Sequence, residues 1–377
     1  MSQKDRPQPA RHLGEIRPSP IRVLSEGAPA DAIPLGLGEP TWELPAVARA
    51  ALAQSPAVCA YGPNAGLPEL RSAVAAFHAA TVEEVMICCG SQGALFSLFM
   101  AWLDVGDVVL APDPGFPAYP ALARLCGATT ASYPLDAGRG FALDGQAVVS
   151  ALRRTPGVKV VVVNHPSNPT GGGASREALA TVARACASAG VLLISDEVYR
   201  DLYFGERPGS LRDVWDGGVV ISSVSKGWGA PGLRVGWAVG PAHWLTPART
   251  VHSYAVTAAA LPAQHAALAL LRASDEVLPA ARTELTKRWS ALQEAAQKYL
   301  HLDPTPPAGA FYWWLPLPAG VADPMTFCLR LREERKVVVV PGSTFGAAGR
   351  GFARLSFAAR PEDITEGIRR LADFWRS

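Results

Sequence analysis

Helix-like segments alternate with short apolar runs from about residue 68 to residue 270. The apolar runs have the composition of strands that are buried on both faces of a sheet. The segments between them are rich in alanine and place apolar residues at helical spacing. This alternation predicts a mostly parallel central sheet covered by helices. We expect strands at Glu84–Cys89, Asp107–Ala111, Lys159–Asn164, Val191–Ser195, Val219–Ser223 and Val235–Val239, and helices at Leu67–Ala80, Gly93–Leu103 and Arg176–Ser188.

A second region begins near residue 275, where this alternation stops. Because the chain has 377 residues and single cores stop growing near about 250–300 residues, we expect two lobes. The prediction is an N-terminal segment 1–44 that joins the small domain, a large domain 45–275 and a small α+β domain 276–377. In the last of these we expect a long helix Asp275–Tyr299, a break at Asp303–Pro307, strands at Phe311–Leu315, Val337–Val340 and Ala353–Ser356, and helices around Asp323–Glu334 and from Pro361.

The charge balance and the distribution of apolar residues narrow the class of partner. A net charge of +2 provides no broad field for binding nucleic acid or anionic lipid, so we expect a small-molecule partner. The first twenty residues are polar and proline-rich, and no apolar stretch has the length of a membrane span. The six scattered cysteines have no metal-site spacing and are expected to be reduced thiols. We therefore expect a soluble cytoplasmic protein without a metal.

Lys226 stands out among the six lysines of the chain. It follows the apolar strand at Val219–Ser223 and precedes a glycine-rich turn, so it lies at the carboxyl end of a buried strand. Ligands of open α/β sheets bind at this edge. A lysine that is desolvated there can lose its proton and form a Schiff base. The alternative is an ordinary solvated lysine at the end of a strand.

Three further strand ends carry polar groups of the same kind. Asp196 ends one apolar run, and a carboxylate in such a place needs a cationic partner. Asn168 lies in a polar turn after another strand, where its amide can donate to a ring oxygen. The segment Gly90–Gly93 follows a third strand and opens a helix, which makes its backbone amides a natural phosphate cradle. Taken singly, these residues also fit ordinary helix caps and turns.

Eight segments in order along nearly the whole chain carry a recognisable pattern: IPLGLGEPTWELP (33–45), YGPNAGLPELR (61–71), GSQGAL (90–95), PDPGFPAY (112–119), NHPSNPTG (164–171), SDEVY (195–199), SVSKGWGAPGLRVGW (223–237) and ARLSFA (353–358). Together they resemble the motifs of the class I/II aminotransferases, which have the α/β fold of pyridoxal-phosphate enzymes of fold type I. The resemblance implies pyridoxal 5′-phosphate as the cofactor, a large domain with a mostly parallel sheet, a smaller α+β domain, and a homodimer with shared active sites.

By position, the resemblance implies that Lys226 forms the Schiff base with the cofactor and that Asp196 partners the pyridine nitrogen. Asn168 and Tyr199 would donate to the phenolic oxygen of the ring. An anionic Asp196 keeps the ring nitrogen protonated, so the ring becomes an electron sink. The amine of Lys226, once released by the substrate, would move a proton as general acid and base.

The remaining roles come from the resemblance in the same way. Phe116 would stack on the ring, and Tyr61 would reach the phosphate in the neighbouring subunit. Arg354 would clamp the substrate's α-carboxylate, with the backbone of Gly38 and the side chain of Asn168 nearby. The phosphate would be held by Ser91, Gln92, Ser223, Ser225 and Arg234. His165 departs from the asparagine that is common at its position.

The function implied is ping-pong transfer of an α-amino group from an amino acid to a 2-oxo acid, an activity of EC 2.6.1 type. A lyase, cyclase or synthase of the same fold is the alternative, because it would use the same cofactor residues. A non-catalytic sensor domain is disfavoured by the intact set of catalytic positions and the absence of a helix-turn-helix. A nicotinamide dehydrogenase is disfavoured because no first strand leads into G-x-G-x-x-G.

The sequence leaves the substrate open. Dicarboxylate-specific relatives use an added cation for the distal carboxylate. Ser91–Gly93 and Tyr254–His265 contain no arginine or lysine, which favours a neutral or aromatic donor. Arg11, Arg17 or Arg22 of the N-terminal segment could instead supply the cation.

Overall fold

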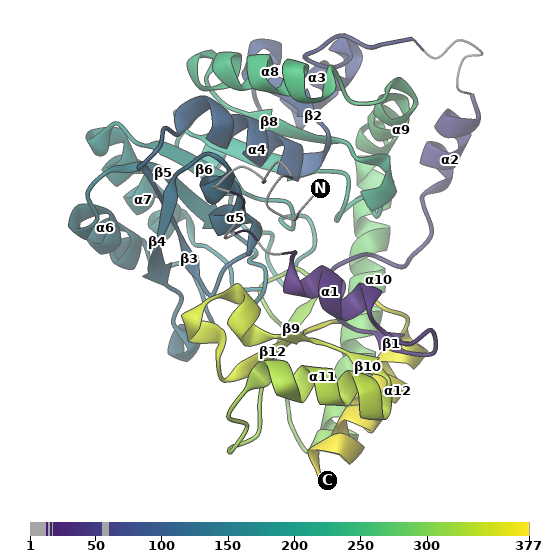
Figure 1. Ribbon diagram of the computed structural model, residues 1–377. Helices are drawn as coiled ribbons and strands as arrows, with labels where there is room; N and C mark the ends of the chain where they lie inside the picture. The colour runs from purple at the N-terminus through teal and green to yellow at the C-terminus, as the bar shows by residue number, and fades with distance from the viewer. Residues whose placement is uncertain (1–12, 14–15, 17, 55–59, 377) are drawn as a thin grey trace, which may run out of the picture.

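The computed structural model describes residues 13, 16, 18–54 and 60–376. A central sheet with helices on both faces forms one lobe, and a smaller lobe built from the C-terminal part lies beside it (Figure 1). The long helix α10 (Ser274–Ala295) runs from the large lobe into the smaller one. Among the described residues, no helix is both long and apolar enough to cross a bilayer.

The central sheet has the strand order β2-β8-β7-β6-β5-β3-β4. Strands β3 to β7 are parallel, and β8 pairs antiparallel with both β2 and β7. All six expected strands form within a few residues of their predicted ends. The structure adds β4, which the sequence analysis missed because this edge strand is polar and mostly exposed. The strands are β2 Val85–Cys88, β3 Val108–Asp113, β4 Thr129–Pro134, β5 Val158–Asn164, β6 Leu192–Asp196, β7 Val219–Ser223 and β8 Gly236–Val239.

Alternating side chains of these strands pack on helices of opposite faces, which is why the strands are apolar throughout. Val160 and Val162 of β5 face a core formed with α4, α5 and α8, whereas Val161 and Val163 face a core formed with α6 and α7. Helices α2, α3 and α9 pack on one another and against side chains of β2 and β8. These helices are α2 Ala46–Ala53, α3 Pro68–Phe77, α4 Gly90–Trp102, α5 Ala118–Leu125, α6 Gly145–Arg154, α7 Arg176–Ala189, α8 Ala242–Val256 and α9 Leu261–Arg272.

The small lobe contains an antiparallel sheet of order β11-β12-β9 and a parallel pair, β1 and β10. The prediction of a single strand at Val337–Val340 is wrong. This segment forms two short strands, β10, which pairs with β1, and β11, which pairs with β12. The N-terminal segment thus adds a strand to this lobe, while the domain boundaries stay a prediction. The strands are β1 Ile33–Pro34, β9 Tyr312–Pro316, β10 Val337–Val338, β11 Val340–Pro341 and β12 Phe352–Ser356, and the helices are α1 Pro20–Glu26, α11 Pro324–Arg335 and α12 Pro361–Trp375.

Short helical turns complete the chain. The predicted long helix Asp275–Tyr299 is confirmed, although its last turn, Ala296–Leu300, is π-helical. The 3₁₀ turns are Val82–Glu84, Ala137–Arg139, Leu211–Asp213, Pro231–Leu233, Gly342–Phe345 and Ala347–Gly349.

Candidate active site

A cavity of about 690 Å³ lies at the carboxyl ends of the parallel strands, between the two lobes. Strands β2, β5 and β6 end there, and the antiparallel β8 begins there, so residues from distant parts of the sequence meet. The predicted site residues that line it are Gly38, Ser91, Gln92, Phe116, Asn168, Asp196, Tyr199, Ser225, Lys226, Arg234 and Arg354.

Two of the predicted site residues are not in the lining of this cavity. Ser223 is fully buried at the end of β7, where its Oγ accepts a hydrogen bond from the backbone N–H of Ser225 at 3.3 Å. Tyr61 is 88% exposed on the surface before α3. In a single chain, therefore, Ser223 supports the turn that carries Ser225, and the predicted role of Tyr61 toward a neighbouring subunit stays a prediction.

Asp196 presents a buried carboxylate to the cavity. Its Oδ2 accepts a hydrogen bond from Tyr119 Oη at 2.8 Å, and its Oδ1 accepts one from the backbone of Val198 at 3.4 Å. Burial raises the pKa of Asp196 from 3.8 to about 6, against the lowering effects of Tyr119, Val198 and Lys226. A cation bound beside this carboxylate would hold it in the ionised form.

Lys226 is half-buried in the lining of the cavity, where Nζ donates to the carbonyl oxygen of Gly38. Burial, followed by the charge of Arg354, lowers the pKa of Lys226 from 10.5 to about 8. A larger share of this amine is neutral near pH 7 than for an ordinary lysine, which suits a nucleophile. Gly38 is required at its position because a Cβ there would be 1.9 Å from Tyr312 Oη.

Arg354 is a buried cation that no described carboxylate neutralises. It is 1% exposed, and its guanidinium donates to Asn168 Oδ1 at 2.7 Å and to the carbonyl oxygen of Gly36 at 2.6 Å. The ring of Tyr312 lies 4.4 Å from its Cζ. Its Nε has no hydrogen-bond partner among the described residues. A buried guanidinium held in this way is suited to bind a carboxylate.

The turn after β5 is tied to the end of β6 by an asparagine that the sequence analysis did not single out. Asn164 Nδ2 donates to the carbonyl oxygen of Asp196 at 3.0 Å, and its Oδ1 accepts from the backbone of Asn168 at 2.8 Å. Asn168 in turn accepts from Arg354. The positions of Asp196, Asn168 and Arg354 are therefore coupled through one chain of hydrogen bonds.

The N-terminus of α4 has the features of an anion-binding site. No side chain caps this helix, so its first backbone N–H groups face the cavity together with Ser91 and Gln92. Gly90 has φ +73°, and a Cβ on it would be 2.4 Å from Arg234 Nη2. The guanidinium of Arg234 therefore lies against the helix terminus. Free amides, hydroxyls and a guanidinium at one place fit a phosphate group.

Three residues of the site were missed by sequence reasoning. Besides Asn164, these are Tyr119, which bonds to Asp196, and Tyr312, whose Oη lies 2.6 Å from Tyr199 Oη. Tyr119 lies in the first turn of α5, which Phe116 precedes, and the two rings pack edge to face with their centroids 5.7 Å apart. Tyr312 belongs to the aromatic run Phe311–Trp314, for which the sequence favours core packing over a pocket wall.

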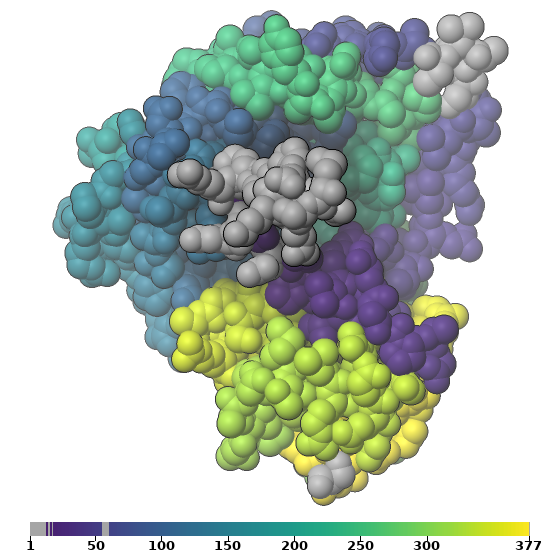
Figure 2. Space-filling view, viewed as in Figure 1, coloured from purple at the N-terminus to yellow at the C-terminus, as the bar shows by residue number. Residues whose placement is uncertain are grey.

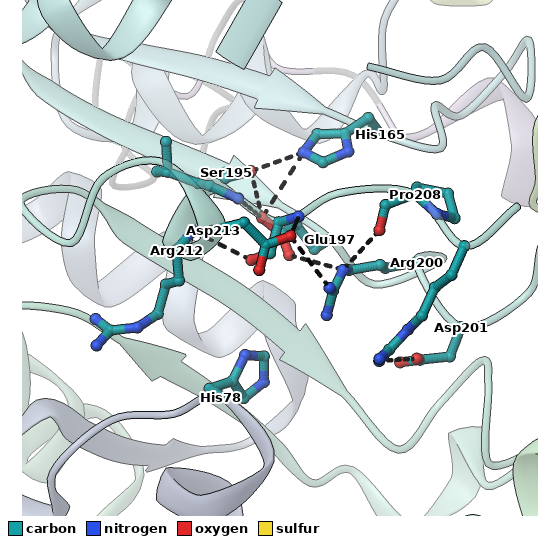
Figure 3. Close-up of polar contacts among 12 residues, drawn as sticks. His78, His165, Ser195, Glu197, Arg200, Asp201, Pro208, Arg212 and Asp213 are labelled. Atoms are coloured by element: carbon teal, nitrogen blue, oxygen red, sulfur yellow. Dashed lines mark hydrogen bonds and ion pairs between the residues drawn. The ribbon is translucent and has the colours of Figure 1, made fainter. Parts of the chain in front are cut away.

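A second polar cluster, whose residues are not in the lining of the cavity, lies around the end of β6 (Figure 3). His165 Nε2 lies 3.1 Å from Ser195 Oγ, which donates to Glu197 Oε1 at 2.9 Å. Arg200 Nε lies 3.8 Å from Glu197 Oε2. Burial, and then the charge of Arg200, lowers the pKa of His165 from 6.5 to about 3. His165 is thus a buried neutral side chain next to the site, not a group that lines it.

Comparison with known proteins gives a consistent result. Residues 30–371 match the family Aminotransferase class I and II. A probable aspartate/prephenate aminotransferase of Aquifex aeolicus is 34% identical over 328 residues, which are 82% of this chain and 82% of the relative. A probable N-acetyl-LL-diaminopimelate aminotransferase of Bacillus subtilis is 33% identical over 338 residues, 87% of this chain and 84% of the relative.

The solved structures agree with the sequence relatives. An aspartate aminotransferase from Thermus thermophilus, solved with maleate, superposes with a TM-score of 0.90 at 31% identity, covering 98% of this chain and 100% of that one. The likeness spans both lobes, and it confirms the family and the α/β fold of type I that the sequence motifs predict. The chain therefore belongs to the class I and II aminotransferases and is an enzyme of this family.

Proposed function

We propose that this aminotransferase binds pyridoxal 5′-phosphate in the cavity and uses Lys226 and Arg354 to transfer an α-amino group from an amino acid to a 2-oxo acid. The observation that carries the proposal is the meeting of Lys226, Asp196 and Arg354 in one cavity with the anion cradle of α4. The relatives named above are aminotransferases, which supports the reaction type over a lyase or synthase.

The residues present fit this cofactor on chemical grounds. Asp196 is a buried carboxylate whose raised pKa calls for a neighbouring cation, such as a protonated pyridine nitrogen. Asn168 and Tyr199 lie in the same lining and would donate to the phenolic oxygen. Phe116 would cover a ring face without a hydrogen bond. The phosphate would be held at α4 by Ser91, Gln92, Ser225 and Arg234, with Ser223 behind Ser225.

Each side chain then has one task in the reaction. When bound, the cofactor supplies the electron sink that stabilises a carbanion at the substrate's α-carbon. Asp196 holds the proton on the ring nitrogen. Lys226, whose pKa of about 8 lies near neutrality, would take the proton from the substrate's α-carbon as general base and would then donate it to carbon C4′ of the cofactor as general acid. Arg354 orients the substrate through its α-carboxylate, which fixes the bond to be broken.

The proposal includes a homodimer in which Tyr61 completes the neighbouring site, since Tyr61 is exposed and has no role within its own cavity. It also includes a cytoplasmic location. The described cysteines Cys88, Cys89, Cys126, Cys186 and Cys328 are free thiols, which supports a reducing compartment.

The test is a substrate panel on the reconstituted enzyme. Each candidate amino acid is added without and then with 2-oxoglutarate or pyruvate, and the two half-reactions are followed by absorbance while new amino acids are quantified. We expect a new amino acid to form in step with the oxo acid released from the donor. Release of ammonia without a new amino acid would contradict the proposal and favour lyase chemistry.

A pair of lysine variants tests whether turnover depends on the lysine in the cavity. Lys226→Ala removes the amine in the cavity, and we expect it to abolish turnover. Lys159→Ala changes an exposed lysine at the start of β5 and should leave turnover within about twofold of the parent. Circular dichroism checks that both variants remain folded.

A further inference from the structure

The buried polar cluster around the end of β6 has no task in the reaction as proposed above. Figure 2 shows α1, in purple, where the large lobe and the C-terminal lobe meet, and residues of this helix line the cavity. The cluster has no such access to ligands, because His165 and Ser195 are 0% exposed, Glu197 is 1% exposed, and none of the three lines the cavity. The inference drawn from it rests on the proposed function and concerns how Asp196 and Tyr199 are held.

The carboxylate of Glu197 joins separate parts of the chain. Its Oε1 accepts hydrogen bonds from Ser195 Oγ at 2.9 Å and from the backbone N–H of Leu211 at 2.8 Å. Its Oε2 lies 3.8 Å from Arg200 Nε, which donates to the carbonyl oxygen of Pro208 at 3.1 Å. Burial raises the pKa of Glu197, but the neighbouring cation and these hydrogen bonds act against burial and favour the ionised form.

The hydrogen bonds of the cluster run in one direction, toward this carboxylate (Figure 3). An ionised carboxylate only accepts, so Ser195 Oγ uses its single proton on Glu197 and accepts from His165. His165 Nε2, 3.1 Å from Ser195 Oγ, therefore carries the ring proton. The other ring nitrogen, Nδ1, is then bare, and it has no hydrogen-bond partner within the described part of the chain. The anionic Glu197 thus sets the tautomer of His165.

The cluster fixes the backbone on both sides of Asp196. Successive side chains at the end of a strand point to opposite faces, so Asp196 reaches the cavity while Ser195 and Glu197 reach the cluster. The carbonyl oxygen of Asp196 accepts a hydrogen bond from the backbone N–H of His165 at 3.2 Å. The backbone N–H of Glu197 donates to the carbonyl oxygen of Ile221, in β7, at 3.0 Å. The direction of the Asp196 side chain therefore depends on how Glu197 is held.

The turn that carries Tyr199 begins at the same residue. The backbone N–H of Arg200 donates to the carbonyl oxygen of Glu197 at 2.9 Å, and the side chains of these two residues also pair. Tyr199 lies inside this turn and lines the cavity, with its Oη 2.6 Å from Tyr312 Oη. A change at the carboxylate of Glu197 would therefore move Asp196 and Tyr199 together.

We propose that Glu197, held by Ser195 and Arg200, is a positioning residue that sets how Asp196 and Tyr199 meet the cofactor, although it touches neither cofactor nor substrate. In the proposed function, Asp196 pairs with the ring nitrogen and Tyr199 donates to the phenolic oxygen. One buried carboxylate outside the cavity thus aligns the partners of both polar groups of the ring. Such alignment matters because a hydrogen bond weakens steeply when its angle departs from linearity.

The pH dependence of the visible absorbance of the holoenzyme tests this role. Glu197→Gln keeps the shape of the side chain and removes its charge. A hydrogen bond from Tyr199 favours the form of the bound cofactor with more negative charge on its phenolic oxygen, which is the form at higher pH. When Tyr199 is displaced, the midpoint of the absorbance change should rise by about half a pH unit or more. The dissociation constant for pyridoxal phosphate should rise roughly tenfold.

Ser195→Ala provides a second variant with a smaller change. It removes the link to His165 but leaves Leu211 and Arg200 on the carboxylate of Glu197. The midpoint and the dissociation constant should therefore shift in the same direction as in Glu197→Gln, but by less. This variant decides the question if Glu197→Gln does not fold.

Asp201→Asn is the matched control. Asp201 is a buried carboxylate of the same turn, 5% exposed, but its partner is Arg207, at 2.6 Å, outside the cluster. The change from acid to amide removes a buried charge, so the variant should lose stability to urea as Glu197→Gln does. Its midpoint and its affinity for pyridoxal phosphate should nevertheless stay those of the parent, since Asp196 and Tyr199 keep their support.

The possible results lead to different conclusions. If the reconstituted parent transaminates no amino acid, the proposed function fails. If it transaminates but folded Glu197→Gln and Ser195→Ala keep both the midpoint and the affinity of the parent, the inference about Glu197 is overturned and the proposed function stands. Equal shifts in Asp201→Asn would also overturn it, because they would show a general effect of losing a buried charge.

Discussion

Arg354 combines deep burial with a positive charge, and its partners are neutral oxygens. This arrangement is stable only because the guanidinium keeps several hydrogen bonds and lies against aromatic rings. It leaves the charge free to attract a carboxylate. The same residue was assigned from sequence by resemblance alone. Its hydrogen bond to Asn168 and its contact with Tyr312 depend on tertiary packing, which no local pattern reveals.

Arg354→Lys tests this role. A lysine keeps the charge but loses the two-point geometry, so KM for an amino-acid donor should rise about 10- to 100-fold while kcat falls less. Steady-state kinetics measure both constants. Arg350→Lys, at an exposed position of the same lobe, serves as control and should change neither. An unchanged KM in Arg354→Lys would remove Arg354 from substrate binding.

His165 links the site to the pH dependence of stability. Its pKa is about 3 in the folded chain and 6.5 in the unfolded chain, so the unfolded chain binds the extra proton between these values. Stability from this group is complete above pH 6.5 and is lost as the pH falls toward 3. The charged groups facing it are Glu197 and Arg200, with Asp213 beyond Arg200.

The buried Asp196 has the opposite effect on the free energy of unfolding. Its raised pKa makes the folded chain bind the extra proton between pH 3.8 and about 6, so this group adds stability as the pH falls through that range. The effect of His165 must therefore be read from a difference between two proteins. We expect the gap in unfolding free energy between parent and His165→Asn to change by up to about 1.4 kcal/mol per pH unit below pH 6. Urea unfolding at several pH values measures it. Parallel profiles would show that His165 is not the titrating group.

Site residues can be predicted from the sequence where they lie next to a strand or helix whose pattern is clear. Apolar runs buried on both faces give clear strands, so Asp196, at the end of one strand, and Lys226, three residues after another, are singled out without a structure. The polar edge strand β4 gives no such signal. The change of partner between β10 and β11 is equally hidden, because it depends on where β1 and β12 lie. Asn164, at the end of β5, bonds to groups that only the folded sheet brings near.

A glycine at the start of α4 provides a test of whether the phosphate binds there. Gly90→Ala places a Cβ at a left-handed φ and against Arg234, so it should destabilise the fold by about 1–2 kcal/mol and weaken cofactor binding roughly tenfold. Gly190→Ala carries the same backbone strain with no neighbour within 4 Å. Fluorescence titration with pyridoxal phosphate should therefore show normal affinity for Gly190→Ala only. Equal affinities would place the phosphate elsewhere.

For the whole molecule, the order of motifs predicts the fold and its type, because eight segments spread over both lobes must come together at one place. The alternation of helix-like and apolar segments alone would have predicted only an α/β protein. The assembly of two chains is a further step, which rests on exposed groups such as Tyr61 and Tyr254, each 88% exposed.

Sedimentation tests that assembly. We expect a species of twice the 39.7 kDa chain mass, and Tyr61→Ala should weaken cofactor binding roughly tenfold because the contact to the neighbouring phosphate is lost. Val105→Ala, at an equally exposed apolar position, should bind the cofactor like the parent. A monomer that binds pyridoxal phosphate with unchanged affinity in Tyr61→Ala would refute the shared site.

The proposed function requires a covalent bond between Lys226 and the cofactor, which chemical trapping can detect. The protein is reconstituted with pyridoxal phosphate, reduced with borohydride, digested and analysed by mass spectrometry. We predict one stable adduct, on the peptide that contains Lys226, and none on Lys226→Ala protein. An adduct confined to another lysine, or no adduct in a folded and reconstituted protein, would contradict the account.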